Sequence, residues 1–389
     1  MNWHQQLASE LEAAEAQHLR RVRNVVSSPQ GPEISLDRQL INFCSNDYLG
    51  FANHPKLIEA AVAAAKKWGV GSGASHLVCG HQELAEDFER DFADFVGAEA
   101  ALLFSTGYMA NFAVINAFFD REGVILQDKL NHASLIDAGR LSRASLQRYS
   151  HSDMDSLESR LRELADKPAL MATDAVFSMD GDLADLSSIS SLAESYGALA
   201  YFDDAHGFGV LGVQGRGSLN SQNLRPRGNN LMLATMGKAL GSFGAVVAGD
   251  QVFVDTLIQK ARPYIYTTAL PPTVIATNAA ALSLLVEEGW RRDHLHTLIN
   301  GFREEAKSIG LELMESDTPI QPLIVGDNSR ALECSAKLRE AGILVTAIRP
   351  PTVPEGSARL RITLTAAHSE DHLRQLLEAL SKLKSEGLL

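Results

Sequence analysis

The segment Ala198-Leu-Ala-Tyr-Phe-Asp-Asp-Ala-His206 is an almost wholly apolar run that ends abruptly in two carboxylates and an imidazole. Its length and composition predict a strand that is buried on both faces, as in a parallel sheet covered by helices. A carboxylate at such a place is costly unless it has a cationic partner. That partner could be a protonated ring nitrogen of a bound cofactor, a metal ion or an arginine, so a ligand site is expected where this strand ends.

Apolar runs of strand length recur on both sides of this segment. They are Ala100–Phe104, Gly123–Gln127, Ala169–Val176, Leu231–Ala234 and Ala245–Ala248. Helical patterns lie between most of them, for example over 107–119, 132–140, 154–164 and 186–196. This alternation predicts an α/β fold with a mostly parallel central sheet flanked by helices. We expect residues 1–45 to form a helix and short strands, 46–285 a large α/β domain, and 286–389 a smaller α+β domain.

Composition excludes several classes of protein. The first 26 residues have the pattern of an amphipathic helix and contain no uninterrupted apolar stretch typical of a signal peptide. The formal net charge of -13 argues against a nucleic-acid or anionic-membrane partner. Cys44, Cys79 and Cys334 form no C-x-x-C pair, so neither a disulfide framework nor a zinc site is indicated. We expect a cytoplasmic protein with no metal.

The residues that follow the other apolar runs also carry chemistry, and ligands of open α/β sheets bind beyond the carboxyl ends of the strands. Gly107 and Tyr108 open a helix whose N-terminus suits a phosphate. His132 and Ser178 follow two further runs, although either could simply cap a helix or a turn. Thr235-Met-Gly-Lys238 follows another run, and a partly desolvated lysine there is a candidate nucleophile or base, if not a solvated lysine in a turn.

Two familiar motifs do not fit. Met232 stands where a Walker A loop needs its first glycine, and the glycines of 69–73 follow a helix and not a strand. Asp203 and His206 could hold a metal, yet no further cluster with ligand spacing supports one. A phosphate site, an aspartate for a pyridinium nitrogen and a lysine for an aldehyde remain, and pyridoxal 5'-phosphate needs these three things.

Five stretches together resemble the α-oxoamine synthases, which are fold-type-I pyridoxal-phosphate enzymes of the aspartate aminotransferase-like fold. They are Asn46-Asp-Tyr-Leu-Gly50, Asn131-His-Ala-Ser134, Phe177-Ser-Met-Asp-Gly-Asp182, Asp203-Asp-Ala-His-Gly207 and Thr235-Met-Gly-Lys238. The similarity runs nearly end to end, although the loop before His76 is less rich in glycine than we expect for the family. Within the family, the stretches 320–330 and 345–354 look most like members that condense L-alanine with a pimeloyl thioester.

The resemblance implies roles for individual residues around the cofactor. Lys238 would form the Schiff base, Asp203 would pair with the pyridinium nitrogen, and His132 would stack on the ring. The remaining cofactor-binding residues would be Gly107, Tyr108, Ser178, His206 and Thr235. The catalytic residues would be Lys238, His132 and Asp203, with Lys238 and His132 as proton carriers.

The resemblance also implies how the substrates bind. Arg20 would lie by the terminal carboxylate of the acyl chain and Arg361 would bind the amino-acid carboxylate, with Asn46, His132 and Thr352 nearby. The neighbouring Arg21 and Arg359 leave both arginine assignments ambiguous. The family is homodimeric with shared active sites, and either CoA or an acyl carrier protein could carry the acyl group.

Other reactions stay open at this point. A relative in the same family could condense glycine with acetyl-CoA or succinyl-CoA. A fold-type-I aminotransferase would instead need a 2-oxo acid and release no carbon dioxide, and a catalytically silent relative would only bind ligand.

Overall fold

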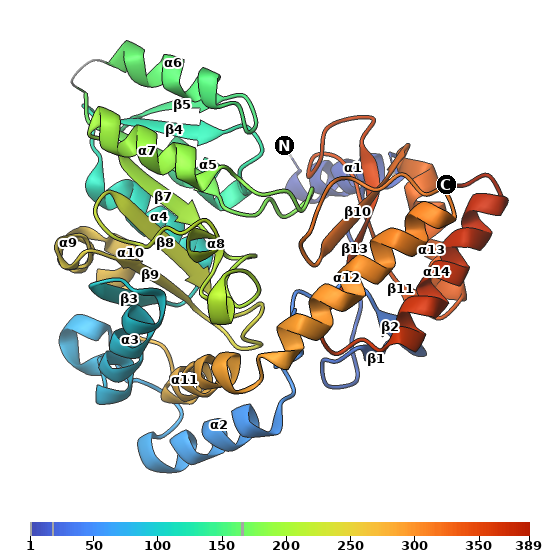
Figure 1. The fold of residues 1–389 in the computed structure, drawn as a ribbon, viewed down its shortest axis with the longest axis horizontal. Helices are drawn as coiled ribbons and strands as arrows, with labels where there is room; N and C mark the ends of the chain where they lie inside the picture. Colours follow the sequence, from blue (N-terminus) through green and yellow to red (C-terminus); the bar gives the residue numbers. More distant parts are fainter. Residues whose placement is uncertain (1, 18, 165–166) are drawn as a thin grey trace. The chain divides into compact units, whose positions relative to one another are not determined.

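The computed structural model describes residues 2–17, 19–164 and 167–389, which form two compact units. The larger unit comprises Asn46–Ser178 and Asp182–Asp293. The smaller unit comprises Met1–Ser45, Met179–Gly181 and His294–Leu389. Figure 1 labels most of the helices and strands of both units.

A seven-stranded sheet forms the centre of the larger unit (Figure 1), and its strand order is β3-β9-β8-β7-β6-β4-β5. Its strands are β3 (Ala100–Phe104), β4 (Val124–Asp128), β5 (Ser145–Tyr149), β6 (Ala169–Asp174), β7 (Leu199–Asp203), β8 (Asn230–Thr235) and β9 (Ala245–Gly249). β9 runs antiparallel to both of its neighbours, and the other pairs in the sheet are parallel. The prediction of a mostly parallel sheet is therefore confirmed.

Helices connect these strands and cover the sheet. They are α2 (Pro55–Trp68), α3 (Glu83–Val96), α4 (Gly107–Phe118), α5 (Ala133–Leu141), α6 (Met154–Leu164), α7 (Leu186–Tyr196), α8 (Ser218–Ser221), α9 (Gln251–Lys260), α10 (Arg262–Ile265) and α11 (Pro272–Glu287), with a short π-helix η1 (His76–Gly80) and a 3-10 turn η2 (Val213–Gly215). The core lies between α4 and the sheet, where Ala110, Ala113 and Val114 are fully buried with Leu233 and Val247. Complete burial of one aliphatic side chain contributes about 1.5–3 kcal/mol. Small residues on α4 allow the helix to approach the strands closely.

The smaller unit holds two three-stranded sheets. β1 (Glu33–Ser35), β2 (Gln39–Asn42) and β11 (Ile343–Leu344) form one of them, and β10 (Ile320–Gly326), β13 (Ala358–Thr363) and β12 (Thr346–Ile348) form the other. Its helices are α1 (Trp3–Ala16), most of α12 (Trp290–Ser308), α13 (Asn328–Glu340) and α14 (Glu370–Ser385). β2 pairs in parallel with β11, so the beginning and the end of the chain share one sheet.

Three local features of the structure were not predicted from the sequence. α1 ends at Ala16, and the described residues 19–26 form no helix, because Arg20 to Val26 combine like charges with β-branched residues and offer no face to bury. β5 was not predicted, because it is a partly exposed edge strand and its polar residues Gln147 and Arg148 interrupt the apolar pattern of a buried strand. η1 also carries no helical periodicity. Among the described helices, no helix is both long and apolar enough to span a membrane.

The turn after β8 requires glycine at position 241. Gly241 has φ +62°, and its N–H donates to the carbonyl of Lys238 at 2.8 Å. A Cβ at this position would lie 2.3 Å from the backbone nitrogen of Ala52. Gly228 also has a positive φ, +60°, but a Cβ there would meet nothing within 4 Å. The two glycines therefore separate the cost of backbone conformation from that of a steric clash.

We expect Gly241→Ala to destabilise the protein more than Gly228→Ala. The left-handed conformation costs each alanine about 1–2 kcal/mol, and the clash at position 241 adds about 1–3 kcal/mol. Chemical denaturation of both variants in one buffer measures the difference. Equal losses of unfolding free energy would contradict a close approach of Gly241 to Ala52.

Candidate active site

Lys238 begins a hydrogen-bonded chain at the end of β8. Its Nζ lies 3.0 Å from Nε2 of His206, and Nδ1 of His206 lies 2.5 Å from the hydroxyl of Tyr48. The Tyr48 hydroxyl donates in turn to Oδ1 of Asn46 at 3.3 Å. Because an ammonium group only donates, Nε2 of His206 accepts and Nδ1 carries the ring hydrogen. The structure thus brings together Asn46, His206 and Lys238.

Asp203 is the last residue of β7 and is buried. Its carboxylate accepts hydrogen bonds from the N–H of Ala205 at 3.1 Å and from Nδ2 of Asn111 at 2.7 Å. Asp174 stands beside it in register at the end of β6. Burial and the neighbouring charge of Asp203 raise the pKa of Asp174 well above its usual range. The raised pKa reflects the cost of holding two like charges at this edge of the sheet.

His132 is the N-cap of α5. Its ring Nδ1 lies 2.7 Å from Oγ of Ser134 and accepts from the backbone N–H of Ser134 at 3.3 Å. The backbone N–H of His132 donates to the carboxylate of Asp174. Desolvation lowers the pKa of His132, the carboxylate of Asp203 opposes this shift, and the ammonium of Lys238 adds to it. His132, Asp203 and Lys238 are therefore close enough to influence one another electrostatically.

The start of α4 offers a phosphate site. Thr106 caps this helix by accepting from the N–H of Met109 at 3.1 Å, whereas the N–H groups of Gly107 and Tyr108 in the same turn have no acceptor within the helix. A Cβ on Gly107 would come 3.0 Å from Cγ2 of Thr235, so Gly107 and Thr235 are neighbours. The hydroxyl of Thr235 donates to the carbonyl of Ala205 at 3.3 Å. The hydroxyl of Tyr108 donates to Asp137 at 2.6 Å, so Tyr108 would offer a phosphate its backbone N–H and not its side chain.

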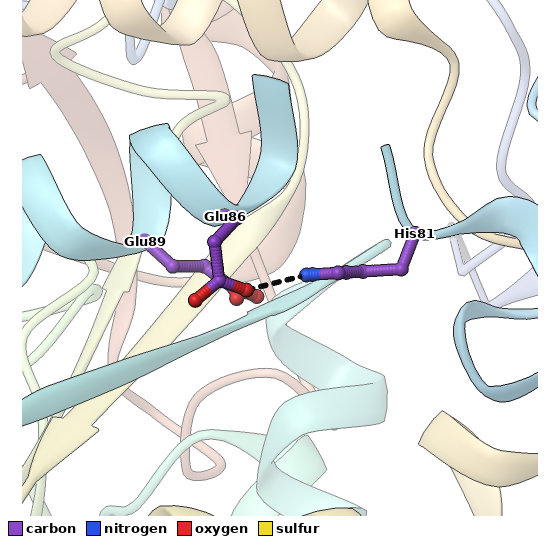
Figure 2. Close-up of side chains that lie close together, drawn as sticks. All are labelled: His81, Glu86 and Glu89. Carbon is purple, nitrogen blue, oxygen red and sulfur yellow. Dashed lines mark hydrogen bonds and ion pairs between the residues drawn. The ribbon is translucent and has the colours of Figure 1, made fainter. Parts of the chain in front are cut away.

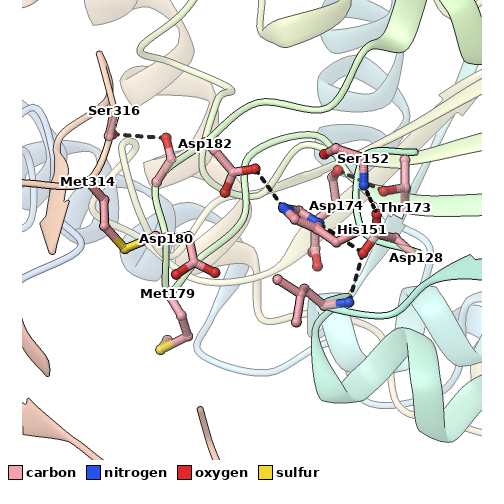
Figure 3. Close-up of polar contacts among 12 residues, drawn as sticks. Asp128, His151, Ser152, Thr173, Asp174, Met179, Asp180, Asp182, Met314 and Ser316 are labelled. Carbon is pink, nitrogen blue, oxygen red and sulfur yellow. Dashed lines mark hydrogen bonds and ion pairs between the residues drawn. The ribbon is translucent and has the colours of Figure 1, made fainter. Parts of the chain in front are cut away.

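Ser178 lies on a loop that His151 holds in place. Nε2 of His151 donates to Asp182 and Nδ1 donates to Asp128, both at 3.0 Å, as Figure 3 shows. The ring of His151 also meets the edge of Phe177, with centroids 4.5 Å apart. Two hydrogen bonds to carboxylates need both ring nitrogens protonated, and they raise the pKa of His151 to about 10. A charged histidine thus fixes the segment that carries Ser178.

The smaller unit contains the other predicted substrate residues. Arg20 is half exposed and pairs with Glu15 at 3.2 Å. Thr352 is exposed, and its N–H donates to the carbonyl of Arg349 at 3.1 Å. Arg361 is buried on β13 and donates to Oγ1 of Thr363 at 3.0 Å. These three residues lie in different segments of the unit.

The sequence left Arg359 and Arg361 as alternatives, and the structure separates them. Arg359 is buried and forms an ion pair with Asp180. It also donates to the carbonyl of Met179 at 3.3 Å. These contacts give Arg359 a structural role within its unit.

Figure 2 shows a second polar group, formed by His81, Glu86 and Glu89, whose potential ligand atoms lie within 4.8 Å of one another. Nε2 of His81 lies 2.8 Å from the carboxylate of Glu86. Glu89 accepts from the N–H of Leu103 at 2.7 Å, and burial raises its pKa to about 8. These protein partners account for the group without a metal ion.

Sequence reasoning missed four residues of the candidate site. Tyr48, Asn111, Asp174 and His151 all contact a predicted residue or fix the segment that carries one. Asn111 could have been found, because it is an amide within the apolar helix pattern of 107–118. Asp174 lies inside the predicted run Ala169–Val176, and the structure ends β6 at this residue.

Comparison with known proteins identifies the class. Residues 38–380 match the family model for aminotransferase class I and II. Serine palmitoyltransferase from Sphingomonas wittichii superposes with a TM-score of 0.92 at 29% identity, over 99% of this chain and 98% of that one. The S. paucimobilis enzyme, solved with bound PLP and myriocin, gives a TM-score of 0.92 at 26% identity over the same shares of the two chains. The chain is a fold-type-I transferase that depends on pyridoxal phosphate.

Closer relatives specify the family. The 8-amino-7-oxononanoate synthase of Stutzerimonas stutzeri is 55% identical over 97% of this chain and 96% of its own length. The synthase of Francisella tularensis has a TM-score of 0.78 at 33% identity, over 90% of this chain and 99% of that one. The chain belongs to the 8-amino-7-oxononanoate synthase family.

The residues at the carboxyl edge of the sheet suit the cofactor. They offer an acceptor carboxylate at Asp203, a primary amine at Lys238 and a helix N-terminus at Gly107. These are the groups that a pyridinium nitrogen, an aldehyde and a phosphate require.

We expect the charge of His151 to make its contribution to stability depend on pH. Its folded pKa lies above the unfolded value, so the contribution is complete below about pH 6.5 and is lost as pH rises toward 10. His151→Gln should lose about 2 kcal/mol of unfolding free energy at pH 6. Denaturation curves from pH 6 to pH 10 should show this deficit shrinking.

The control for this experiment is His296→Gln, because His296 is exposed on α12. A deficit of His151→Gln that stays constant across the pH range would show that His151 is not held as a cation.

Proposed function

We propose that the protein condenses L-alanine with a pimeloyl thioester and releases carbon dioxide. The product is 8-amino-7-oxononanoate, and CoA or acyl carrier protein is set free, as a step in biotin biosynthesis. The observation that carries the proposal is Lys238 Nζ held 3.0 Å from His206, beside the buried carboxylate of Asp203. The choice of substrates is supported by relatives named 8-amino-7-oxononanoate synthase at 54–55% identity.

The expected cofactor-binding residues all belong to the larger unit, and each would contact one part of the cofactor. When bound, pyridoxal phosphate supplies an electron sink for a carbanion at the amino-acid α-carbon. Asp203 would accept a hydrogen bond from the ring nitrogen, and His132 would pack against the ring. Gly107, Tyr108 and Thr235 would lie at the phosphate, and Ser178 and His206 at the ring hydroxyl.

Lys238 is the residue that moves the proton. Its amine would be the group that holds the aldehyde of the bound cofactor. It then removes the proton from the α-carbon of alanine and later returns a proton to the same atom. The hydrogen bond to Nε2 of His206 orients Nζ for this transfer.

Substrate binding would use Arg20, Thr352 and Arg361 of the smaller unit and Asn46 of the larger unit. Arg361 would bind the carboxylate of alanine, with Asn46 and Thr352 nearby, and Arg20 would meet the terminal carboxylate of the acyl chain. The Arg359–Asp180 ion pair supports this choice, because it engages the competing arginine.

We also propose that two copies form a homodimer with shared active sites. Val78 and Tyr266 are apolar side chains with exposed fractions of 77% and 71%, and both belong to the larger unit. A second copy would cover such residues.

The free thiols of Cys44, Cys79 and Cys334 fit a cytoplasmic location.

Replacement of Lys238 tests the chemistry. We expect Lys238→Ala to reduce turnover by a factor on the order of 1,000 or more, because tether and base are lost together. Borohydride treatment of the wild-type holoenzyme followed by peptide mass spectrometry should find the cofactor on Lys238. Lys260→Ala removes an exposed lysine of α9 and should leave both results unchanged.

A substrate panel tests the choice of reactants. Release of CoA should be fastest with L-alanine and pimeloyl-CoA, and pimeloyl-acyl carrier protein is compared in parallel. Preference for L-serine with palmitoyl-CoA would instead match the serine palmitoyltransferase fold neighbours. Preference for glycine with acetyl-CoA or succinyl-CoA would indicate another α-oxoamine synthase, and transfer to a 2-oxo acid an aminotransferase.

A further inference from the structure

A chain of buried polar side chains links Asp203 to His132. Nδ2 of Asn111 donates to Oδ2 of Asp203 at 2.7 Å and to Oγ of Ser134 at 2.8 Å. Oδ1 of Asn111 accepts from the hydroxyl of Tyr201 at 2.8 Å. Oγ of Ser134 lies 2.7 Å from Nδ1 of His132. Asn111 on α4 thus stands between the carboxylate at the end of β7 and the imidazole at the start of α5.

The directions of these hydrogen bonds are determined by the donors available. The amide nitrogen of Asn111 has two hydrogens, and Asp203 and Ser134 take one each. Its oxygen accepts from the hydroxyl of Tyr201. A flipped amide would place Oδ1 against the carboxylate of Asp203, where two acceptors would repel each other, and Nδ2 against the hydroxyl of Tyr201. Asn111 therefore presents a hydrogen to Ser134.

The hydrogen bonds of Ser134 determine which ring nitrogen of His132 carries the hydrogen. Its Oγ accepts from Asn111, and its backbone N–H donates to Nδ1 of His132 at 3.3 Å. A hydrogen on Nδ1 would oppose that N–H, so the hydroxyl hydrogen of Ser134 also points at Nδ1. Nδ1 is then an acceptor, and the neutral ring carries its hydrogen on Nε2.

Burial makes the chain hard to rearrange. Asn111 and Ser134 are each 1% exposed, Tyr201 is 0% exposed, and Ala110 and Val114 beside Asn111 on α4 are fully buried. Solvent cannot replace a lost partner in such a place, and an unsatisfied buried amide is costly. A buried asparagine among alanines and valines would weaken the core unless its hydrogen-bonding groups were satisfied, and here the three partners satisfy them.

We propose that Asn111 is a positioning residue that couples Asp203 to His132 and holds His132 as the Nε2–H tautomer. The inference rests on the roles proposed above for Asp203 and His132 but not on the identity of the substrates. The consequence is that His132 and Lys238 have different roles in the reaction. His132 presents an N–H donor at Nε2 and cannot accept a proton there, so removal of the α-proton is left to Lys238.

The test compares Asn111→Leu with Asn116→Leu. Leucine has the same number and branching of side-chain heavy atoms as asparagine and removes its hydrogen bonds. Asn116 lies on the same helix, and its amide donates to the carbonyls of Phe112 and Ala138, away from His132. Holoenzyme labelled with 15N-histidine reports the tautomer of each ring, and the spectrum of His132→Gln identifies the signal of His132.

We expect Nε2–H in the wild type and in Asn116→Leu. In Asn111→Leu the Nδ1–H form should become populated, because Ser134 can then turn its hydroxyl hydrogen away. The dissociation constant for pyridoxal phosphate, measured by titration of the apoenzyme, should rise by a factor on the order of 10 in Asn111→Leu, since Asp203 loses a donor. Neither readout involves alanine or an acyl thioester, so failure of the proposed reaction would leave this test intact.

Ser134 supplies a second pair of variants if Asn111→Leu fails to fold. Ser134→Ala should shift the tautomer signal while leaving cofactor affinity within about twofold of the wild type, because Asn111 still donates to Asp203. Ser134→Thr keeps the hydroxyl and should restore the wild-type signal. An unchanged His132 signal in both Asn111→Leu and Ser134→Ala would overturn the proposal, as would a wild-type ring with its hydrogen on Nδ1.

Discussion

Two carboxylates at adjacent strand ends constrain the site more than any other feature. Asp174 and Asp203 stand side by side in register on β6 and β7, where the sheet is buried on both faces. Like charges at such a distance and depth cannot both persist without compensation. The N–H of His132, the amide of Asn111 and the ammonium of Lys238 are all arranged around this pair.

The sequence predicted much of the fold because each buried strand is a short apolar run, and each run of the parallel sheet ends at the same edge. Asp203, His206 and Lys238 could be placed near one another for that reason alone. The α/β class and the cofactor followed from strand ends and motifs. The roles of individual residues and the division into 1–45, 46–285 and 286–389 stay predictions.

The remaining parts of the site depend on contacts that local patterns do not encode. Asn111 meets Asp203 across 92 residues of chain, and Tyr48 meets His206 across 158. Likewise, Arg359 and Arg361 share a face of one strand, and Arg359 forms its ion pair with Asp180, which lies on a loop distant in the sequence. Periodicity shows which face of an element is buried, but it does not show which polar partner arrives there.

His151 shows a histidine in a place where a permanent cation is needed. An imidazolium presents two N–H donors at opposite ends of a flat ring, so it can span two carboxylates that face each other, Asp128 and Asp182. Lysine would concentrate its charge at one point, and arginine would need more room beside Phe177. The residue usually associated with pH sensing therefore serves here as a rigid spacer of fixed length, whose charge is constant at physiological pH.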